Sequence, residues 1–577
     1  MHLATIDWVI VGAVMAITLA TGLWVARRSS TDSVSFFLAG RGMPWWLLGT
    51  SMVATTFATD TPNLVTNLVR TGGVAANWVW WCFLITGMLT AFVYARLWRR
   101  LGVTTDIEFY ERRYAGREAA FLRGFRAVYL GFFFNVMIMA NVTLAAIKIG
   151  GVLFSASPVA VVMSAGMITV IFATVGGFLG VLVTDMLLFV LAMSGALAAA
   201  WYAVNHPAVG GLDALINHPA IADKLSLLPD MSDPDQWVPL LLIPLAVQWW
   251  SVWYPGAEPG GGGYVAQRML AAKNERHAMA AVAFFNFAHY ALRPWPWILV
   301  ALASIVVFPD LESLSAALPQ IDAGIVRDDL AYPAMLTFLP AGVMGLVVAS
   351  LMSAYVSTIS TSLNWGASYL VNDVYGRFIR PDADERRKVL VGRVMTVVLM
   401  ICASALALVL ESALQAFHLL LTIGAGTGLL FLLRWFWSRI NAWSEISAMV
   451  FSFGFSVAFE FWGEALGVAD LAQWQRFLLA VGLTTAGWIA VTLVTKPTAP
   501  EKMTSFRADI TGATGVSLRT ELRAGIKTSL WAIAAVYGLM FGIGYLLYGE
   551  MVLAVHWLVV AAIAGWTAYG KVRNTAE

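Results

Sequence analysis

The chain has 577 residues, of which 59% are hydrophobic and 12% are charged, and its formal net charge is +2. A soluble domain carries about twice that charged fraction, so a water-soluble protein is excluded. Apolar runs follow one another from about residue 6 to about residue 570. Each is long enough, at roughly 20 residues, to cross a bilayer core as a helix. The sequence therefore predicts an all-α integral membrane protein embedded in a lipid bilayer, with no nucleic-acid partner.

Taken in chain order, the apolar runs give about fifteen spans. They cover residues 6–26, 44–69, 74–98, 121–148, 156–177, 180–204, 236–256, 276–308, 336–372, 388–410, 414–436, 442–464, 472–495, 526–547 and 551–570. The first run lacks preceding Lys or Arg and a cleavage site, so we interpret it as a retained helix. Cys82 and Cys402 both lie inside apolar runs, which argues against a disulfide framework.

Basic residues in the connecting loops predict the orientation. Every basic cluster follows an odd-numbered span, whereas the alternate loops hold only isolated Lys or Arg. One such cluster, after the seventh span, consists of Arg268, Lys273 and Arg276. Because cytoplasmic loops carry the excess of Lys and Arg, we expect a multi-pass protein of the inner (cytoplasmic) membrane. Its N-terminus would lie outside and its C-terminus inside.

The second span is interrupted at residues 58–63 (ATDTPN). Pro62 removes a backbone donor, and Asp60, Thr61 and Asn63 can bond the backbone groups that this frees. About fourteen residues precede the interruption, so it would fall at mid-depth in the membrane. The alternative interpretation is that this segment ends a helix in a loop.

The seventh span is interrupted at residues 253–263 (WYPGAEPGGGG). Two prolines and five glycines cannot stay a regular helix in lipid, and such backbone is tolerated only when buried in protein or lining a cavity. The two interruptions lie five spans apart on helices of opposite direction. That pattern is typical of inverted-repeat transporters with a site near the membrane midplane. A loop end is again the alternative, since the glycines approach the inner surface.

The ninth span carries a face of small and hydroxylated residues. Ala354, Ser357, Thr358 and Thr361 recur at the spacing that places them on one side of a helix. Sodium is a hard cation that needs several oxygens, and these hydroxyls together with carbonyls from the broken second span would supply them. The alternative is that the residues let helices pack closely. Asp185, an ionisable residue within the sixth span, favours the cation site.

Other polar residues near the interruptions are candidates for contact with a polar solute. Asp60 and Glu258 lie in the two interruptions, and Arg293 lies deep in the eighth span with His289 one turn earlier. Each is equally compatible with an internal ion pair or a cap. Trp253 and Tyr254 stand beside the second interruption, where aromatic rings suit either the membrane interface or a wall of the solute site.

Several segments resemble the sodium:solute symporter family, which includes sodium/glucose, sodium/proline and sialic acid symporters. They are residues 36–46 (FFLAGRGMPWW), residues 267–273 (QRMLAAK), Asp185, and residues 357–373. The resemblance covers about residues 6–435 and implies a LeuT-like fold of five plus five inverted-repeat helices. On that basis we assign residues 1–43 to an extra helix and linker, 44–437 to the ten-helix core, and 438–577 to accessory helices.

The resemblance also implies site residues. One sodium ion would be held by the carbonyls of Ala54, Phe57 and Ala354 and by the hydroxyls of Ser357 and Thr358. A second sodium ion would be held by Asp185, Ser357, Ser360 and Thr361. One further hydroxyl that the resemblance leads us to expect at this site is absent, because Ala58 occupies its position.

At the positions where the sugar-transporting members of the family bind solute, this chain has different residues. The resemblance places Thr61, Trp78 and Tyr290 at those positions, with Glu258 and Arg293 as candidate substitutes for the lost polar groups.

The sequence thus predicts a sodium-coupled symporter that works by alternating access on a small polar solute, with a sugar or sugar derivative as the first assignment, and not an enzyme. Amino acids, organic cations and carboxylates remain alternatives, as does proton coupling. A membrane solute sensor is an alternative of another class. An intramembrane enzyme is disfavoured because His289, His418 and His556 are scattered without the spacing of metal ligands.

Overall fold

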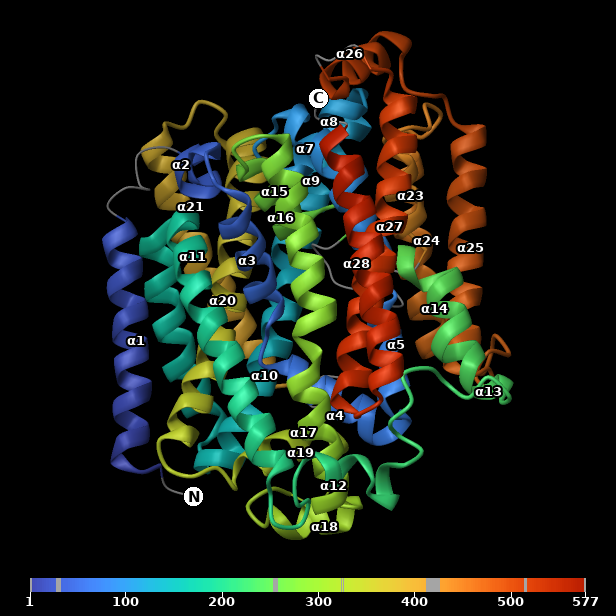
Figure 1. Ribbon diagram of the computed structural model, residues 1–577. Coiled ribbons are helices and arrows are strands. Elements are labelled where there is room, and N and C mark those ends of the chain that lie inside the picture. Colours follow the sequence, from blue (N-terminus) through green and yellow to red (C-terminus); the bar gives the residue numbers. More distant parts are fainter. Residues whose placement is uncertain are drawn as a thin grey trace.

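The computed structural model describes residues 3–26, 33–252, 258–322, 324, 326–410, 426–512 and 516–574. Within these ranges the regular structure is helical, apart from an isolated bridge between Met43 and Ala272. The long helices run roughly side by side, and the two termini lie at opposite ends of the bundle (Figure 1). An odd number of membrane passes requires that placement. The predicted all-helical architecture is confirmed.

Eleven helical runs among the described residues are long and apolar enough to cross a membrane. They are Thr5–Gly22, Val74–Leu101, Gly116–Phe154, Gly177–Val204, Glu275–Val307, Val343–Ile379, Glu385–Ala407, Ala442–Phe459, Gln473–Val494, Leu518–Leu547 and Met551–Arg573. The other predicted spans differ for separate reasons: 44–69 and 236–256 are broken into shorter helices, and 156–177 contains only a short apolar helix, Pro158–Ile171. Most of 414–436 lies outside the described residues, so the total of about fifteen stays a prediction.

The individual helices of the first half are α1 (Thr5–Ala26), α2 (Ser33–Leu38), α3 (Trp45–Thr56), α4 (Asp60–Gly72), α5 (Trp78–Trp81), α6 (Leu84–Leu89), η3 (Thr90–Tyr94), α7 (Ala95–Leu101), α8 (Phe109–Arg113), α9 (Gly116–Val128), η5 (Tyr129–Phe134), α10 (Asn135–Phe154), α11 (Pro158–Val204), α12 (Leu212–Ile216), α13 (Pro234–Trp237), η7 (Val238–Leu242) and α14 (Ile243–Ala246). Those of the second half are α15 (Gly263–Ala271), α16 (Glu275–Phe287), η9 (Ala288–Leu292), α17 (Pro294–Val307), α18 (Leu311–Ala317), α19 (Ala331–Leu336), α20 (Val343–Tyr369), η12 (Leu370–Ile379), α21 (Glu385–Ala407), α23 (Gly428–Leu433), α24 (Ala442–Phe461), α25 (Gln473–Val494), α26 (Pro500–Ile510), α27 (Leu518–Leu547) and α28 (Met551–Asn574). Short 3-10 turns cover Ala39–Arg41, Val74–Asn77, Asp106–Glu108, Pro219–Ile221, Gln248–Trp250 and Asp328–Leu330.

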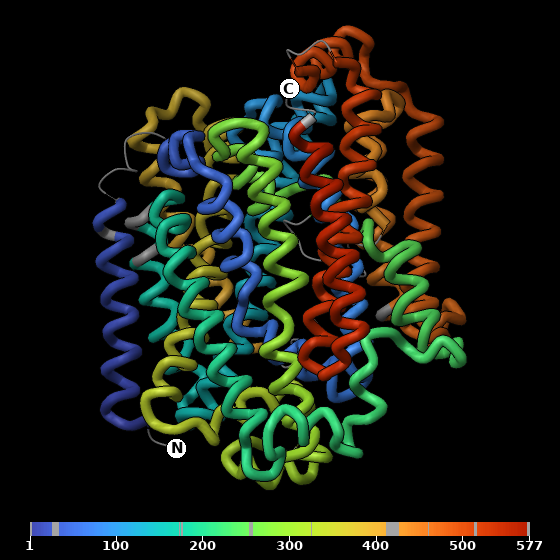
Figure 2. Tube along the Cα trace, in the orientation of Figure 1, coloured from blue at the N-terminus to red at the C-terminus, as the bar shows by residue number. Residues whose placement is uncertain are grey.

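Helix α20 lies at the centre of the part of the bundle that holds the site. It packs against α11, α1, α21, α10 and α3, and nearly all of its side chains are buried. Helix α11 is divided at Gly177, whose φ of 55° and ψ of −168° are not helical. Helix α1 stands at one edge of the bundle and α25 at the opposite edge (Figure 2).

The last two helices pair with each other, and α27 also packs on the helices of the predicted core. The Tyr537 hydroxyl donates to the carbonyl of Trp81 at 2.9 Å, and the Ser529 hydroxyl donates to that of Met88 at 3.0 Å. Helix α27 is therefore joined to the core by specific hydrogen bonds as well as by apolar contact.

The first predicted interruption is present. Helix α3 ends at Thr56 and α4 begins at Asp60, and Phe57 between them has φ −87° and ψ 69°, outside the helical region. Pro62 is the third residue of α4, where a missing N–H costs little because the first-turn N–H groups have no helical acceptor.

The second interruption is also present in the described residues around it. Residues 251–252 and 258–262 are not helical, and α15 begins at Gly263. Gly260 and Gly261 have φ of 81° and 93°, a conformation that side chains other than glycine rarely adopt. The predicted residues Trp253 and Tyr254 lie outside the described residues.

Candidate sodium and solute site

The end of α3 and the hydroxyl face of α20 meet at the first interruption. The Thr358 hydroxyl donates to the carbonyl of Thr55 at 2.8 Å. Ala54 and Phe57, whose carbonyls are predicted sodium ligands, flank Thr55, and Ser357, Thr358 and Ala354 are buried on α20. The last carbonyls of a helix lack the regular helical donors and carry the negative end of its dipole; the carbonyl of Ala54 accepts from the capping N–H of Phe57 at 3.1 Å. This all-oxygen junction fits a hard cation such as sodium.

Asp185 of α11 lies beside the same junction and is fully buried. It accepts hydrogen bonds from Ser357 at 2.6 Å and from Ser51 of α3 at 2.5 Å. The carboxylate therefore joins α11, α3 and α20. A buried carboxylate is costly unless it is hydrogen-bonded and balanced by a positive charge.

Arg268 of α15 supplies that positive charge. Its Nη2 atom lies 3.8 Å from an Asp185 carboxylate oxygen and donates to Ser51 and Thr361, each at 2.9 Å. The prediction that Arg268 belongs to the basic residues of an inner loop is wrong, because Arg268 lies on α15 and its side chain is fully buried. Because α15 begins directly after the second interruption, a basic residue beside a helix break can lie inside the bundle and need not lie in a loop.

The positively charged side chain of Arg268 therefore lies among the residues of the predicted second sodium site. Arg268 touches both Asp185 and Thr361, and Thr361 also meets Thr55 at 3.0 Å between hydroxyl oxygens. Ser360 instead donates to the carbonyl of Ser357 at 3.2 Å. Ala58, the position of the missing hydroxyl, packs in an apolar cluster with Tyr355 and Val142.

A second polar cluster lies on another side of the α3 terminus. Arg293, 2% exposed, donates from Nη1 to the Thr56 hydroxyl at 3.0 Å, and its Nη2 lies 3.2 Å from His289 Nε2. His289 Nδ1 in turn lies 3.0 Å from the same hydroxyl. His289 sits in η9, a π-helical turn of the kind that often occurs at functional sites.

The start of α4 adds a carboxylate to this region. Asp60 is the first residue of α4 and lies 3.5 Å from the amide nitrogen of Asn141. Thr56, Asp60 and Thr61 keep partly exposed surface, although Phe57, Ala58 and Thr59 between them are buried. The groups that remain accessible at the first interruption are therefore polar.

Of the predicted aromatic residues, Tyr290 faces this cluster and Trp78 does not. Tyr290 lies 4.5 Å from His289 and stacks on Trp80 at 5.8 Å between ring centroids. Trp78 donates to the carbonyl of Leu227 at 2.9 Å and packs on Tyr537 of α27. Trp80, which is not among the predicted solute residues, lies two residues further along and faces the opposite way, as alternate positions of a helix often do.

Glu258 is held elsewhere, in the second interruption. Its carboxylate pairs with Arg126 of α9 at 3.1 Å, and both side chains are buried. It lines a small cavity of about 40 Å³ together with Tyr290, Thr86 and Asn286. The structure therefore gives Glu258 an internal ion pair, on a cavity whose lining residue Tyr290 also contacts His289 of the Arg293–Thr56 cluster.

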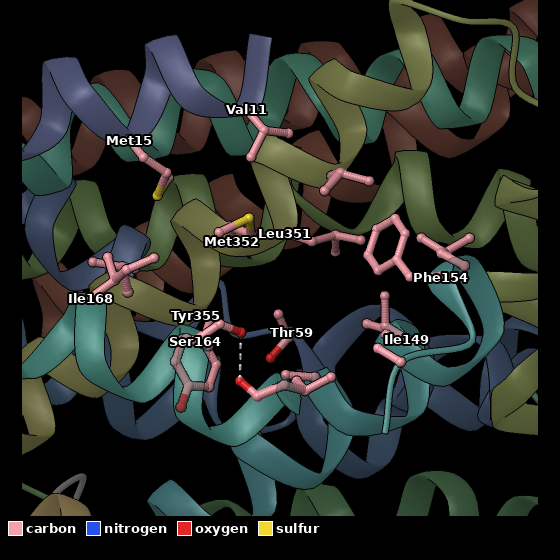
Figure 3. A pocket seen from close by; sticks show the side chains of 18 of the residues that line it. Val11, Met15, Thr59, Ile149, Phe154, Ser164, Ile168, Leu351, Met352 and Tyr355 are labelled. Atoms are coloured by element: carbon pink, nitrogen blue, oxygen red, sulfur yellow. Dashed lines mark hydrogen bonds between the residues drawn. The ribbon is translucent and has the colours of Figure 1, made fainter. Parts of the chain in front are cut away.

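A larger cavity of about 510 Å³ lies between α1, α10, α11 and α20 (Figure 3). Its lining is almost wholly apolar; Val11, Met15, Ile149, Phe154 and Leu351 point into it. Thr59 brings it close to the first interruption. A polar solute would lose its hydration there without replacement hydrogen bonds, so this cavity is not the solute site.

Comparison with known proteins shows the family of the chain. The model of the sodium:solute symporter family matches residues 36–451, and the chain belongs to that family. It is 27% identical to a sodium/glucose cotransporter of Vibrio parahaemolyticus over 482 residues, which cover 80% of this chain and 86% of that one. It is 25% identical to a sodium/mannose cotransporter of Bos taurus, covering 69% of this chain and 68% of that one.

A solved structure of a Na⁺-coupled sialic acid symporter matches the fold. The TM-score is 0.69 with 20% identity, over 86% of this chain and 99% of that chain. The predicted LeuT-like helical fold is confirmed. Family and fold together identify the chain as a sodium-coupled solute symporter of the membrane.

Proposed function

We propose that the protein takes up a sugar or sugar derivative together with sodium by alternating access. The observation that carries the proposal is the α3 terminus, where the all-oxygen junction with α20 and the Arg293–His289–Thr56 cluster share one helical turn. The sugar assignment is supported by the glucose and mannose cotransporters among the relatives.

Coupling follows from this shared turn. A sodium ion held by the carbonyls of Ala54 and Phe57 and by the hydroxyls of Ser357 and Thr358 would fix the end of α3 against α20. Thr56 lies between those two carbonyls, so the same event orders the hydroxyl that positions Arg293 and His289. An ion drives a conformational change only by its differential affinity for the two states. We propose that the ordered turn is the state that binds solute.

We further propose one sodium ion per solute. Arg268 already places a positive charge beside Asp185 and Thr361, and two cations in one buried site repel each other. A Hill coefficient of about 1 for the sodium dependence of uptake is expected, since the coefficient cannot exceed the number of coupled sites. A coefficient near 2 would contradict the single-ion proposal.

We propose an inner-membrane location with the N-terminus outside and the C-terminus inside. The alternation of basic loops supports it, as does the position of the two termini at opposite ends of the bundle (Figure 1). A C-terminal reporter that is active only in the cytoplasm should therefore be active.

The test of transport uses the purified protein in liposomes. Labelled sugars and sugar derivatives are offered with an inward sodium gradient and, in parallel, with an inward potassium gradient. We expect accumulation of at least one of them with sodium only. Uptake that is equal under both gradients would contradict sodium coupling.

A further inference from the structure

The buried arginines of the described chain differ in how their charge is balanced. Six are buried: Arg70, Arg113, Arg126, Arg268, Arg293 and Arg434. Four of them lie within 4 Å of a carboxylate; the pairs are Arg70–Asp328, Arg126–Glu258, Arg268–Asp185 and Arg434–Glu445. Arg113 donates to the main-chain carbonyls of Arg434 and Trp437 at 3.0 and 3.1 Å. Arg293 has neither arrangement.

The two acceptors that Arg293 does have are neutral and already engaged. Because a guanidinium only donates, His289 Nε2 must accept from it, which leaves the ring proton on Nδ1 facing Thr56. The Thr56 hydroxyl therefore accepts from both side chains and donates to the main-chain carbonyl of Val53 at 3.0 Å. Neither group can supply the missing negative charge.

The remaining surroundings of Arg293 give it no direct contact with an anion among the described residues, although the Asp60 carboxylate acts on its charge from beyond 4 Å. The guanidinium carbon lies 5.2 Å from the ring of Trp297 and 6.0 Å from that of Phe57, and Nε is buried with no hydrogen-bond partner in the part of the chain that the structure describes. No carboxylate of the described residues lies within 4 Å of it. Since an unpaired charge inside a membrane protein is costly, the geometry points to an anionic partner from the ligand. The planar fork of a guanidinium matches a carboxylate.

Asp60 has a different role, because its own charge is partly stabilised. It lies in the first turn of α4, whose N-terminus favours a negative charge, and Asn141 approaches it. It makes no ion pair with Arg293 within 4 Å. One turn further along α4, Asn63 is buried, and neither of its amide atoms has a partner among the residues that the structure describes. A carboxylate acceptor and a free amide are groups that bind hydroxyls.

We propose that the solute is a hydroxylated carboxylic acid, such as a sugar acid. Its carboxylate binds Arg293, and its hydroxyls face Asp60 and Asn63. This inference rests on the proposed function and narrows it from sugars in general to their acids.

The experiment compares matched pairs of solutes in the sodium-driven liposome assay: glucose with glucuronate and galactose with galacturonate. Propionate, an acid without hydroxyls, and serine, a zwitterion, complete the panel. We expect an acid to inhibit or undergo uptake roughly tenfold or more better than its neutral partner, because a hydrogen-bonded charge pair contributes that much. We expect propionate and serine to be poor solutes.

Two variants of Arg293 locate the effect. Arg293→Gln should abolish the preference for the acid, whereas Arg293→Lys, which keeps the charge but not the fork, should retain part of it. Arg70→Gln, at a buried arginine that pairs with Asp328, is the control and should leave the ratio of acid to neutral uptake unchanged. Each variant is first checked for sodium-dependent thermal stabilisation, so that a misfolded protein is recognised.

The outcomes separate the two proposals. Sodium-dependent uptake of the neutral sugars that equals or exceeds that of the acids would overturn the acid inference and leave sodium-coupled sugar uptake standing. Preference for serine, or an unchanged acid preference in Arg293→Gln, would also overturn it. Acid uptake that proceeds equally with potassium would contradict the proposed function itself.

Discussion

The two broken helices contain similar residue types but use their charges in opposite ways. At the first break, between α3 and α4, Asp60 and the nearby Arg293 lack an ion-pair partner within 4 Å among the described residues, and Thr56, Asp60 and Thr61 remain partly exposed. At the second break Glu258 pairs with buried Arg126, and Gly263 donates its N–H to Asp106 at 2.8 Å.

The difference shows how to tell a binding group from a structural one. A buried charge that is balanced within the protein needs no charge from a ligand: Glu258 is balanced by Arg126, although its Oε2 has no hydrogen-bond partner among the described residues. Where a buried charge is not balanced, the ligand must complete it. On this criterion the first break is the site of sodium and solute, and the second break supports it. The predictions below test that division, from the largest effect to the smallest.

The largest effect is expected at the second break. Glu258→Gln leaves the Arg126 charge buried without its partner, and breaking a buried pair costs about 3–5 kcal/mol. We expect a large loss of thermal stability with or without solute, measured on the purified protein. Because Arg126→Gln combined with Glu258→Gln removes both charges, the double variant should recover part of it. A stable Glu258→Gln protein with selectively impaired solute binding would place Glu258 in the solute site instead.

The next effect concerns sodium. Thr358→Ala removes one oxygen from the junction of α3 and α20, and we expect the sodium concentration for half-maximal uptake to rise about tenfold, equivalent to roughly 1.4 kcal/mol. Thr358→Ser keeps the hydroxyl and should stay close to the wild type. If Thr358→Ala kept its sodium requirement, the predicted ligand set would be wrong.

Asp60→Asn should weaken solute binding without changing sodium binding. Asparagine also stabilises a helix N-terminus, so α4 should persist while the stronger acceptor is lost. Hydrogen bonds to charged groups contribute about 1.5–3 kcal/mol; because the amide still accepts hydrogen bonds, we expect a several-fold rise in the solute KM, in uptake assays at saturating sodium. An equal change in the sodium requirement would show that Asp60 belongs to the ion site.

The smallest effect is expected at the exposed ion pair between Arg377 and Glu111, whose side chains are 45% and 22% exposed. Arg377→Gln should lower stability by about 1 kcal/mol or less, with a smaller difference at high salt, because exposed ion pairs are weak and screened. Thermal unfolding at low and high salt measures this. A loss that matched Glu258→Gln would remove the distinction between the two kinds of pair.

The features that depend on local sequence were predictable. Pro62 and the glycines before α15 mark both breaks, and the spacing of Ser357, Thr358 and Thr361 places their hydroxyls on one helix face. These follow from backbone chemistry and helix period. The family resemblance added the fold, which the family match and the solved structure confirm.

The features that depend on packing between distant helices were not predictable. Nothing in the sequence tells that Arg268 reaches Asp185, 83 positions earlier, or that Glu258 reaches Arg126. Arg268 follows a glycine-rich break and stands near other basic residues, and this pattern predicts a position in a loop. Whether Trp78 or Trp80 faces the solute cluster depends on how α5 packs against η9. The sequence does not show this packing, so the prediction names Trp78 where the structure has Trp80.

The most direct test of the account is the reciprocity of sodium and solute binding. The affinity of the purified protein for the transported solute is measured at low and at saturating sodium, and its affinity for ²²Na⁺ is measured with and without that solute. Because both ligands act on the turn that holds Thr56, each should raise the affinity for the other by the same factor. If the two affinities were independent, the α3 terminus would not be the coupling element.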